Sequence, residues 1–452
     1  MDAADLDYRT RTLSGCIPPL LVTRLLELGH TEEVEFQAGR GEWFCAREWA
    51  RLLGDQGRQA EALEVLAPYV ATGWWPAAQA QAELLESWGQ AEEAIALARP
   101  YAEVGGRPLE FFARLLARHG RTDEAVARLS AGIEDWLLAT ALVDIAGEAG
   151  RDEDIAALLA ARIPEVHRCD SPWCCRTGLD PDTAIGLLAT IRERQGRVDE
   201  AIALLHSRQH ITSVNNHDQL ADLLAKHDRI EELRAYAASE DHGHAAQCLA
   251  EVLEERGDVE GAIAAYRTFG ASPEGMWNVA VPLTRLLVRH GRSDEAIEVM
   301  HTLADQVGAE DWIVDTLCTL YADHGRAQDG LAYLDALKAR RGGEEEWDFF
   351  RLRLRLMADC DLLDQAIERA RTHAQGDTSY AARTISGLLA KTGRVEEAVA
   401  VLEPHTFANR SSLADHLIEL GRVKHAVMLL QQRKSESVAP VWPGSFSNEP
   451  RF

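Results

Sequence analysis

The sequence predicts an all-α fold, a right-handed superhelical solenoid of about a dozen helix–turn–helix repeats. Three observations predict it: one short string recurs at a fixed period, apolar residues before each copy follow helical spacing, and the composition favours helices. Hydrophobic residues make up 46% of the 452 residues, which is enough for a continuous core. Each repeat of such an array packs only on its neighbours, so this length does not require several compact domains.

The recurring string reads Gly-Arg-x-Asp/Glu-Glu-Ala-Ile/Val-x-x-Leu. Its glycine, or the aspartate that replaces the glycine in two copies, is called the mark of the repeat. The marks follow one another at an average spacing of about 33 residues, a period typical of arrays of paired helices. The thirteen marks are Gly29, Gly57, Gly89, Gly120, Gly150, Gly196, Asp228, Gly257, Gly291, Gly325, Asp361, Gly393 and Gly421.

Each mark is expected to end the first helix of its repeat, helix A, in a left-handed conformation. Glycine adopts that conformation without steric cost, and aspartate tolerates it better than most residues. The acidic residues that follow suit the positive end of the second helix, helix B. Pro68, Pro100 and Pro404 fall eleven residues after their marks, so we expect those B helices to end early.

These strings resemble the tetratricopeptide repeat, with which they share the turn glycine and the Asp-Glu-Ala opening of helix B. The resemblance covers roughly residues 29–433, and the Ala- and Arg-rich composition is similar to that of actinobacterial members of the family. The usual tyrosine before the turn is leucine in most copies. The resemblance implies an array in which helix A lines a concave groove that binds another protein.

The period also divides the chain into segments. Between Gly150 and Gly196 the spacing lengthens to 46 residues, so an insert interrupts the array. We expect the tail to be disordered, and it could be a ligand for another copy of the chain. The segments are an N-terminal cap at 1–28, repeats at 29–162, a Cys-rich insert loop at 163–181, repeats at 182–433 and the tail at 434–452.

The charge of the chain restricts its partners. A net charge of −26 disfavours nucleic acids and anionic membranes. Solubility explains this charge, and a partner with a basic segment is the alternative. The N-terminus lacks the apolar region of a signal peptide, and no apolar run is long enough to cross a membrane. Eight cysteines in so long a chain fit free thiols, so we expect a cytoplasmic protein and leave its oligomeric state open.

The resemblance also implies groove positions at fixed distances before each mark. Their side chains would make the groove acidic in the middle and basic near both ends. The alternative is that they are only solvated helix faces with charge pairs between residues four apart. The positions hold Phe44, Arg47, Arg51, Asn215, Asp218, Asp222, Gln247, Glu251, Glu254, Arg351, Arg355 and Arg383.

Tryptophan begins helix A in several repeats. Because this offset continues the apolar stripe, we expect core packing, with a ligand-stacking ladder as the alternative. Trp312 is one residue out of register and is expected to face the groove. The tryptophans in register are Trp43, Trp75, Trp136, Trp277 and Trp347.

No spacing predicts catalysis, and no cofactor is expected, because the chain has neither a Gly-rich phosphate loop nor a His-Glu-x-x-His motif. Candidate metal ligands in the insert are His167, Cys169, Cys174 and Cys175, although adjacent cysteines rarely bind one zinc ion. A loop with free thiols and a redox-sensitive cysteine pair are the alternatives there. The sequence therefore predicts a non-catalytic scaffold for a peptide or protein segment. A ligand-responsive regulatory sensor and a metal- or thiol-dependent activity at the insert remain as alternatives.

Overall fold

The computed structural model describes residues 2–163, 178–208, 218–240, 242–343 and 345–432. These residues form 27 α-helices and one 3₁₀ helix, and the described ranges contain no strand, so the predicted all-α class is confirmed. Most of the predicted insert loop and the predicted tail lie outside the described residues. Every described helix is too short or too polar to span a membrane.

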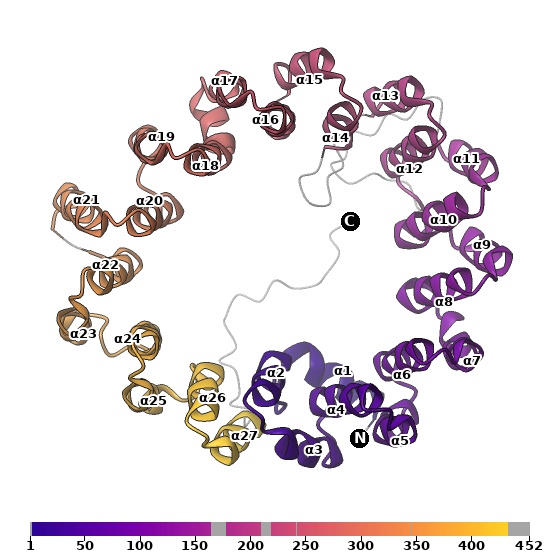
Figure 1. Ribbon diagram of the computed structural model, residues 1–452, viewed down its shortest axis with the longest axis horizontal. Coiled ribbons are helices and arrows are strands. Elements are labelled where there is room, and N and C mark those ends of the chain that lie inside the picture. Colours follow the sequence, from indigo (N-terminus) through magenta and orange to yellow (C-terminus); the bar gives the residue numbers. More distant parts are fainter. Residues whose placement is uncertain (1, 164–177, 209–217, 241, 344, 433–452) are drawn as a thin grey trace, which may run out of the picture. The chain divides into compact units, whose positions relative to one another are not determined.

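The chain divides into two units, Met1–Leu97 with Ile367–Phe452 and Ala98–Ala366. In the second unit each A helix from α8 to α20 packs on the B helix that follows it, and several A helices also pack on the next A helix (Figure 1). Its helices are α8 (Gly106–Arg118), α9 (Thr122–Ala131), α10 (Trp136–Glu148), α11 (Asp152–Ala160), α12 (Pro181–Arg194), α13 (Val198–His206), α14 (Gln219–Lys226), α15 (Ile230–Ala237), α16 (His244–Glu255), α17 (Val259–Phe269), α18 (Pro273–Arg289), α19 (Ser293–Val307), α20 (Asp311–Asp323), α21 (Ala327–Arg340) and α22 (Trp347–Asp359).

The first unit combines the two ends of the chain. Its helices are α1 (Ala3–Thr12), α2 (Pro19–Glu27), α3 (Thr31–Gly39), α4 (Trp43–Asp55), α5 (Gln59–Val70), α6 (Trp75–Ser87), α24 (Ser379–Lys391), α25 (Val395–Leu402), η1 (Glu403–His405), α26 (Arg410–Glu419) and α27 (Val423–Gln431). Two helices, α7 (Ala91–Ala102) and α23 (Leu363–Thr372), contain the boundaries between the units.

One apolar core joins the N-terminal and C-terminal segments of the first unit. Helix α2 packs against α26, and Leu417 of α26 is fully buried in a cluster that includes residues of α2 to α5. Arg24 lies 3.8 Å from Asp415, and the Gln431 side chain donates a hydrogen bond to Gln37 at 2.7 Å. The first and last repeats therefore cover each other's apolar surfaces.

The backbone at the marks confirms the predicted turns. All eleven glycine marks have positive φ, and so do the two aspartate marks, Asp228 at 59° and Asp361 at 61°. Among the described residues, Leu13 is the only other non-glycine residue with positive φ. The sequence therefore identified the end of every A helix that precedes a mark.

Two of the three predicted early helix ends are wrong. Pro68 and Pro100 lie inside α5 and α7, which continue for two residues beyond each proline. In α5 the residue after the proline, Tyr69, is fully buried and packs edge to face on Trp43 at 5.1 Å. We attribute the continued helix to this packing, which compensates for the backbone hydrogen bond that proline cannot donate. At Pro404 the prediction is confirmed, because α25 ends at Leu402 and a 3₁₀ helix follows.

The arginine of the recurring string has a role that the sequence did not reveal. Arg292 bonds to Glu295 of its own repeat and, at 2.6 Å, to Glu260 of the preceding repeat. Because the acidic partners are largely exposed, each bridge adds little stability and acts mainly on the register between repeats. The same double contact is made by Arg151, Arg229 and Arg326.

Candidate binding surface

In the unit Ala98–Ala366, two predicted groove residues, Asp222 and Arg355, make side-chain contacts with a neighbouring A helix. His244 of α16 lies 3.2 Å from Asp222 of α14, and Arg355 of α22 donates to Thr319 of α20 at 3.0 Å. Residues of one A helix therefore contact those of the next at these two points. We call this surface the A-layer face and define it by Asp222, Gln247, Glu251, Arg285, Trp277, Trp312, Thr319, Arg351 and Arg355.

Two predicted groove residues belong to the structural core instead. Asp218 is 6% exposed and caps α14, where it accepts hydrogen bonds from the Leu220 amide at 3.0 Å and from the Tyr236 hydroxyl. Its carboxylate is thus used within the fold, and its prediction as a ligand contact is wrong. Phe44 is also buried, at 7% exposure, among the apolar residues of the first unit.

Glu254 is engaged by the next repeat. It accepts hydrogen bonds from Arg289 at 3.0 Å and pairs with His290 at 2.8 Å. The hydrogen bond from Arg289 holds the pKa of Glu254 below its ordinary value, so the carboxylate stays charged and paired. This arrangement favours the alternative interpretation of a solvated, internally paired helix face at this position.

The predicted basic positions in the first unit are also paired. Arg47 and Arg51 both bond to Glu48, at 2.9 and 3.1 Å. Arg383 donates to the Asn409 side chain at 3.0 Å and so fixes the turn before α26. Five predicted residues lie outside the described ranges; they are Asn215, His167, Cys169, Cys174 and Cys175.

Three charged residues of the A-layer face have no partner on another helix among the described residues. Glu251 is exposed and accepts only from Gln247 of its own helix, at 2.9 Å. Arg285 of α18 is exposed and has no hydrogen bond or ion pair within the described chain. Arg351 lies 3.7 Å from Asp348, again on its own helix. These charges contribute little to folding and are accessible to a ligand.

The tryptophans singled out in the sequence form a buried, a half-buried and an exposed group, and Trp75 and Trp312 are the half-buried ones. Trp43 and Trp347 are buried, as predicted, but Trp136 is 57% exposed and Trp277 is 37% exposed, so core packing is wrong for these two. Trp277 packs edge to face on Trp312 of the next A helix, with ring centroids 4.9 Å apart. The pair places a partly exposed aromatic surface across α18 and α20.

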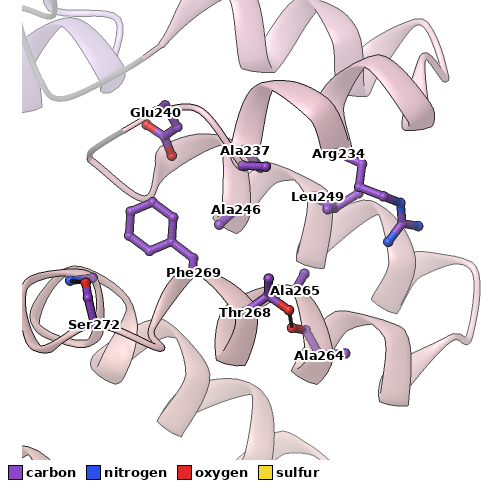
Figure 2. Close-up of a pocket in the computed structure, with 12 residues that line it drawn as sticks. Arg234, Ala237, Glu240, Ala246, Leu249, Ala264, Ala265, Thr268, Phe269 and Ser272 are labelled. Atoms are coloured by element: carbon purple, nitrogen blue, oxygen red, sulfur yellow. Dashed lines mark hydrogen bonds between the residues drawn. The ribbon is translucent and has the colours of Figure 1, made fainter.

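A pocket of about 730 Å³ lies on the B-helix side of the same unit, between α15, α16 and α17. Figure 2 shows Phe269 near Glu240 and Ser272, with Arg234 on the opposite side. Helix α15 has only eight residues, and the small side chains around it leave space unfilled. The alanines that line the pocket are Ala237, Ala238, Ala246, Ala264 and Ala265.

The end of the pocket near Phe269 is fixed by a close backbone approach. A Cβ at Gly275 would lie 2.2 Å from the Phe269 carbonyl oxygen, so only glycine lets α18 start this close to α17. Glu240 accepts a hydrogen bond from the Ala245 amide at 3.0 Å, and burial raises the pKa of its carboxyl group. The lining of the pocket is mainly apolar, and its polar side chains are those of Arg234, Glu240, Thr268 and Ser272.

A third feature, missed by the sequence reasoning, is a cluster of Asp222, His244 and Cys248. Cys248 Sγ lies 3.4 Å from both Asp222 Oδ1 and His244 Nε2. Burial, followed by the charge of Asp222, raises the pKa of the Cys248 thiol. A catalytic triad needs the carboxylate and the nucleophile on opposite ring nitrogens, whereas here both contact Nε2. The available signal was His-x-x-x-Cys on one helix face, beside Asp222 of the preceding repeat.

No protein-family model matches the sequence, and no curated protein matches it. Among solved structures, the chain is similar to the structure of Naa15/Naa10 bound to HypK-THB, with 13% identity, a TM-score of 0.39 and coverage of 91% of this chain and 75% of that one. It is also similar to the maize pentatricopeptide repeat protein PPR10, at 17% identity, a TM-score of 0.35 and coverage of 97% and 64%. A tetratricopeptide repeat protein from Parabacteroides merdae matches at 13% identity and a TM-score of 0.28, with coverage of 69% and 100%.

Proposed function

We propose that the chain is a non-catalytic scaffold that binds a peptide or protein segment along the A-layer face of α16, α18 and α20. The Trp277–Trp312 pair carries this proposal. Trp277 is held by its neighbour and yet remains 37% exposed. Tryptophan, with tyrosine and arginine, is enriched among the few residues that dominate the binding free energy of protein interfaces.

Charge supports a segment with basic residues. Glu251 lies on the A helix that precedes the A helix of Trp277 and has no partner on another helix within the described ranges, and the chain carries a net charge of −26. A Lys or Arg of the bound segment can pair with Glu251, and an acidic residue with Arg285. The same net charge disfavours nucleic acid as the partner.

The pocket between α15 and α17 is a second candidate surface for this function. Its volume of about 730 Å³ lies within the roughly 300–1,000 Å³ usual for ligand pockets, and its lining is mainly apolar. It suits a large apolar side chain of a bound segment. Substitution of Ala265 by Phe fills this space and tests the pocket separately from the A-layer face.

The test is selection from a random peptide display library on the immobilised full chain, followed by dissociation constants measured by fluorescence polarisation. We expect selected peptides to combine an aromatic or aliphatic residue with Lys or Arg. The double variant Trp277→Ala/Trp312→Ala should weaken binding by about 30-fold or more, which corresponds to the 2 kcal/mol of an interface hot spot. Glu251→Lys should weaken the basic peptides most.

Two matched controls lie away from the proposed surface. Trp136→Ala removes an exposed tryptophan from α10, and Glu298→Lys reverses an exposed charge on the B helix α19; both should leave binding unchanged. Peptides that bind the double tryptophan variant as well as the native chain would exclude the A-layer face. If Ala265→Phe alone abolished binding, the pocket would be the site. Failure to select any peptide would count against the scaffold itself.

A further inference from the structure

Three chemically different donor atoms from two neighbouring repeats meet at one point. Asp222 of α14 contributes Oδ1, and His244 and Cys248, one helical turn apart on α16, contribute Nε2 and Sγ. The oxygen and nitrogen are 3.2 Å apart, and the sulfur is 3.4 Å from each of them. The cluster is therefore a nearly equilateral triangle of atoms.

Hydrogen bonds account for two sides of this triangle, because the Cys248 thiol donates to Asp222 Oδ1 and His244 Nε2 can donate to the same oxygen. The third side is then left without a hydrogen bond, since Sγ and Nε2 lie 3.4 Å apart while both direct their protons at Asp222. An ion above the centre of the triangle can accept a lone pair from all three atoms at once.

The separations match those around a tetrahedral zinc ion. Zinc binds oxygen and nitrogen at about 2.0–2.1 Å and sulfur at about 2.3 Å. Tetrahedral angles then place oxygen and nitrogen about 3.3 Å apart, and sulfur about 3.5 Å from each. The observed 3.2 and 3.4 Å agree with these values within about 0.1 Å, well inside the spread of such bonds.

We propose that Asp222, His244 and Cys248 bind one zinc ion between α14 and α16, with the fourth position open to water or a donor from a bound partner. Cys248 is buried at 5% exposure, the His244 side chain is 17% exposed and that of Asp222 is 44% exposed. The site thus opens to solvent on the side of Asp222. Its occupation would link two adjacent A helices, and it does not depend on the proposed peptide binding.

The first measurement is the metal content of the full chain after expression with zinc, by mass spectrometry, followed by titration of the metal-free chain with zinc chloride and with cobalt chloride. Cobalt reports its ligands, because a thiolate-to-cobalt charge-transfer band in the near ultraviolet requires a cysteine ligand. Loss of residues that only support a ligand costs about 10–100-fold in affinity. We therefore expect Cys248→Ser and Asp222→Asn each to weaken binding by more than about 100-fold.

The cysteines of the predicted insert require a control. The triple variant Cys169→Ser/Cys174→Ser/Cys175→Ser should keep one equivalent of zinc and the cobalt band, whereas Cys248→Ser should lose one equivalent and the band. Asp222 is half exposed, so Asp222→Asn tests the site without disturbing the core. Hydrogen exchange in α14 and α16 should slow on adding zinc to the native chain only. A native chain without zinc, or equal zinc affinity in Cys248→Ser and the native chain, would overturn the proposal.

Discussion

A buried carboxyl group in the first unit allows a quantitative test of its stability. Glu42 precedes α4, has an exposed fraction of 2% and lies 3.2 Å from Arg9 of α1. Burial raises the pKa of Glu42 to about 7, although the charge of Arg9 opposes this rise. The cost of removing the carboxylate from water therefore exceeds the attraction to Arg9.

The pKa determines the sign and size of the effect. Because the folded chain holds the Glu42 proton up to about pH 7 and the unfolded chain only to about 4.5, stability falls as the pH rises through this window. At about 1.4 kcal/mol per pKa unit, the difference corresponds to about 3 kcal/mol. This stability is fully present below pH 4.5 and is lost above pH 7.

Glu42→Gln removes the titration and should make the first unit more stable at pH 8. Hydrogen exchange with mass spectrometry, expressed as protection factors, measures local opening of α1 and α4. The full 3 kcal/mol corresponds to about 100-fold in protection. Because Arg9 loses its charged partner, we expect a gain of at least about tenfold at pH 8 and no gain at pH 4.5.

The control for this experiment is Glu64→Gln, which neutralises an exposed carboxylate of α5 in the same unit. It should leave the protection factors of α1 and α4 unchanged at both pH values. If Glu42→Gln lowered the protection at pH 8, attraction to Arg9 would outweigh burial and the reasoning would be refuted.

Three further predictions concern the repeats. Asp228→Gly should raise the free energy of unfolding by about 1 kcal/mol, since a left-handed conformation strains residues with a Cβ, and Gly120→Ala should lower it by a similar amount; urea denaturation measures both. Leu417→Ala should cost about 2–5 kcal/mol and reduce exchange protection in α2 as well as in α26, and an effect confined to α26 would contradict the shared core. Arg292→Ala should shift the melting temperature by less than about 2 °C, because its partner Glu260 is 78% exposed.

The features predicted correctly from the sequence depend on local backbone chemistry. Every turn was found because a left-handed residue needs glycine, and the two aspartate marks, Asp228 and Asp361, were found because the period required a turn there. Pro68 was misjudged because burial of Tyr69, a tertiary interaction, keeps the helix intact. Local rules identify the repeats, and packing decides where a local rule fails.

The binding surface was harder to predict, because the register of the repeats predicts on which side of a helix a residue lies but not which residues it contacts. Asp218 and Asp222 are four residues apart, yet the first caps a helix and the second meets His244 of the next repeat. Trp277 was expected in the core because its offset continues the apolar stripe. It is instead partly exposed and packs on Trp312, a residue of the next A helix that is one position out of register. Contacts between repeats depend on such single-residue offsets, and the recurring string that defines the repeats does not contain them.

The contact between the N-terminal and C-terminal helices of the first unit is another feature that the repeat pattern did not predict, and it joins the residues that are farthest apart in the sequence. A helical array normally needs terminal repeats with a polar outer face, because each end repeat lacks one neighbour. Here α2 and α3 meet α26 and α27, so the apolar residues of each end find their missing neighbour at the other end. No periodicity encodes this contact, since the residues that make it, such as Gln37 and Gln431, are ordinary members of their repeats. The ends should therefore gain and lose stability together, and their core is a property of the whole chain rather than of any one repeat.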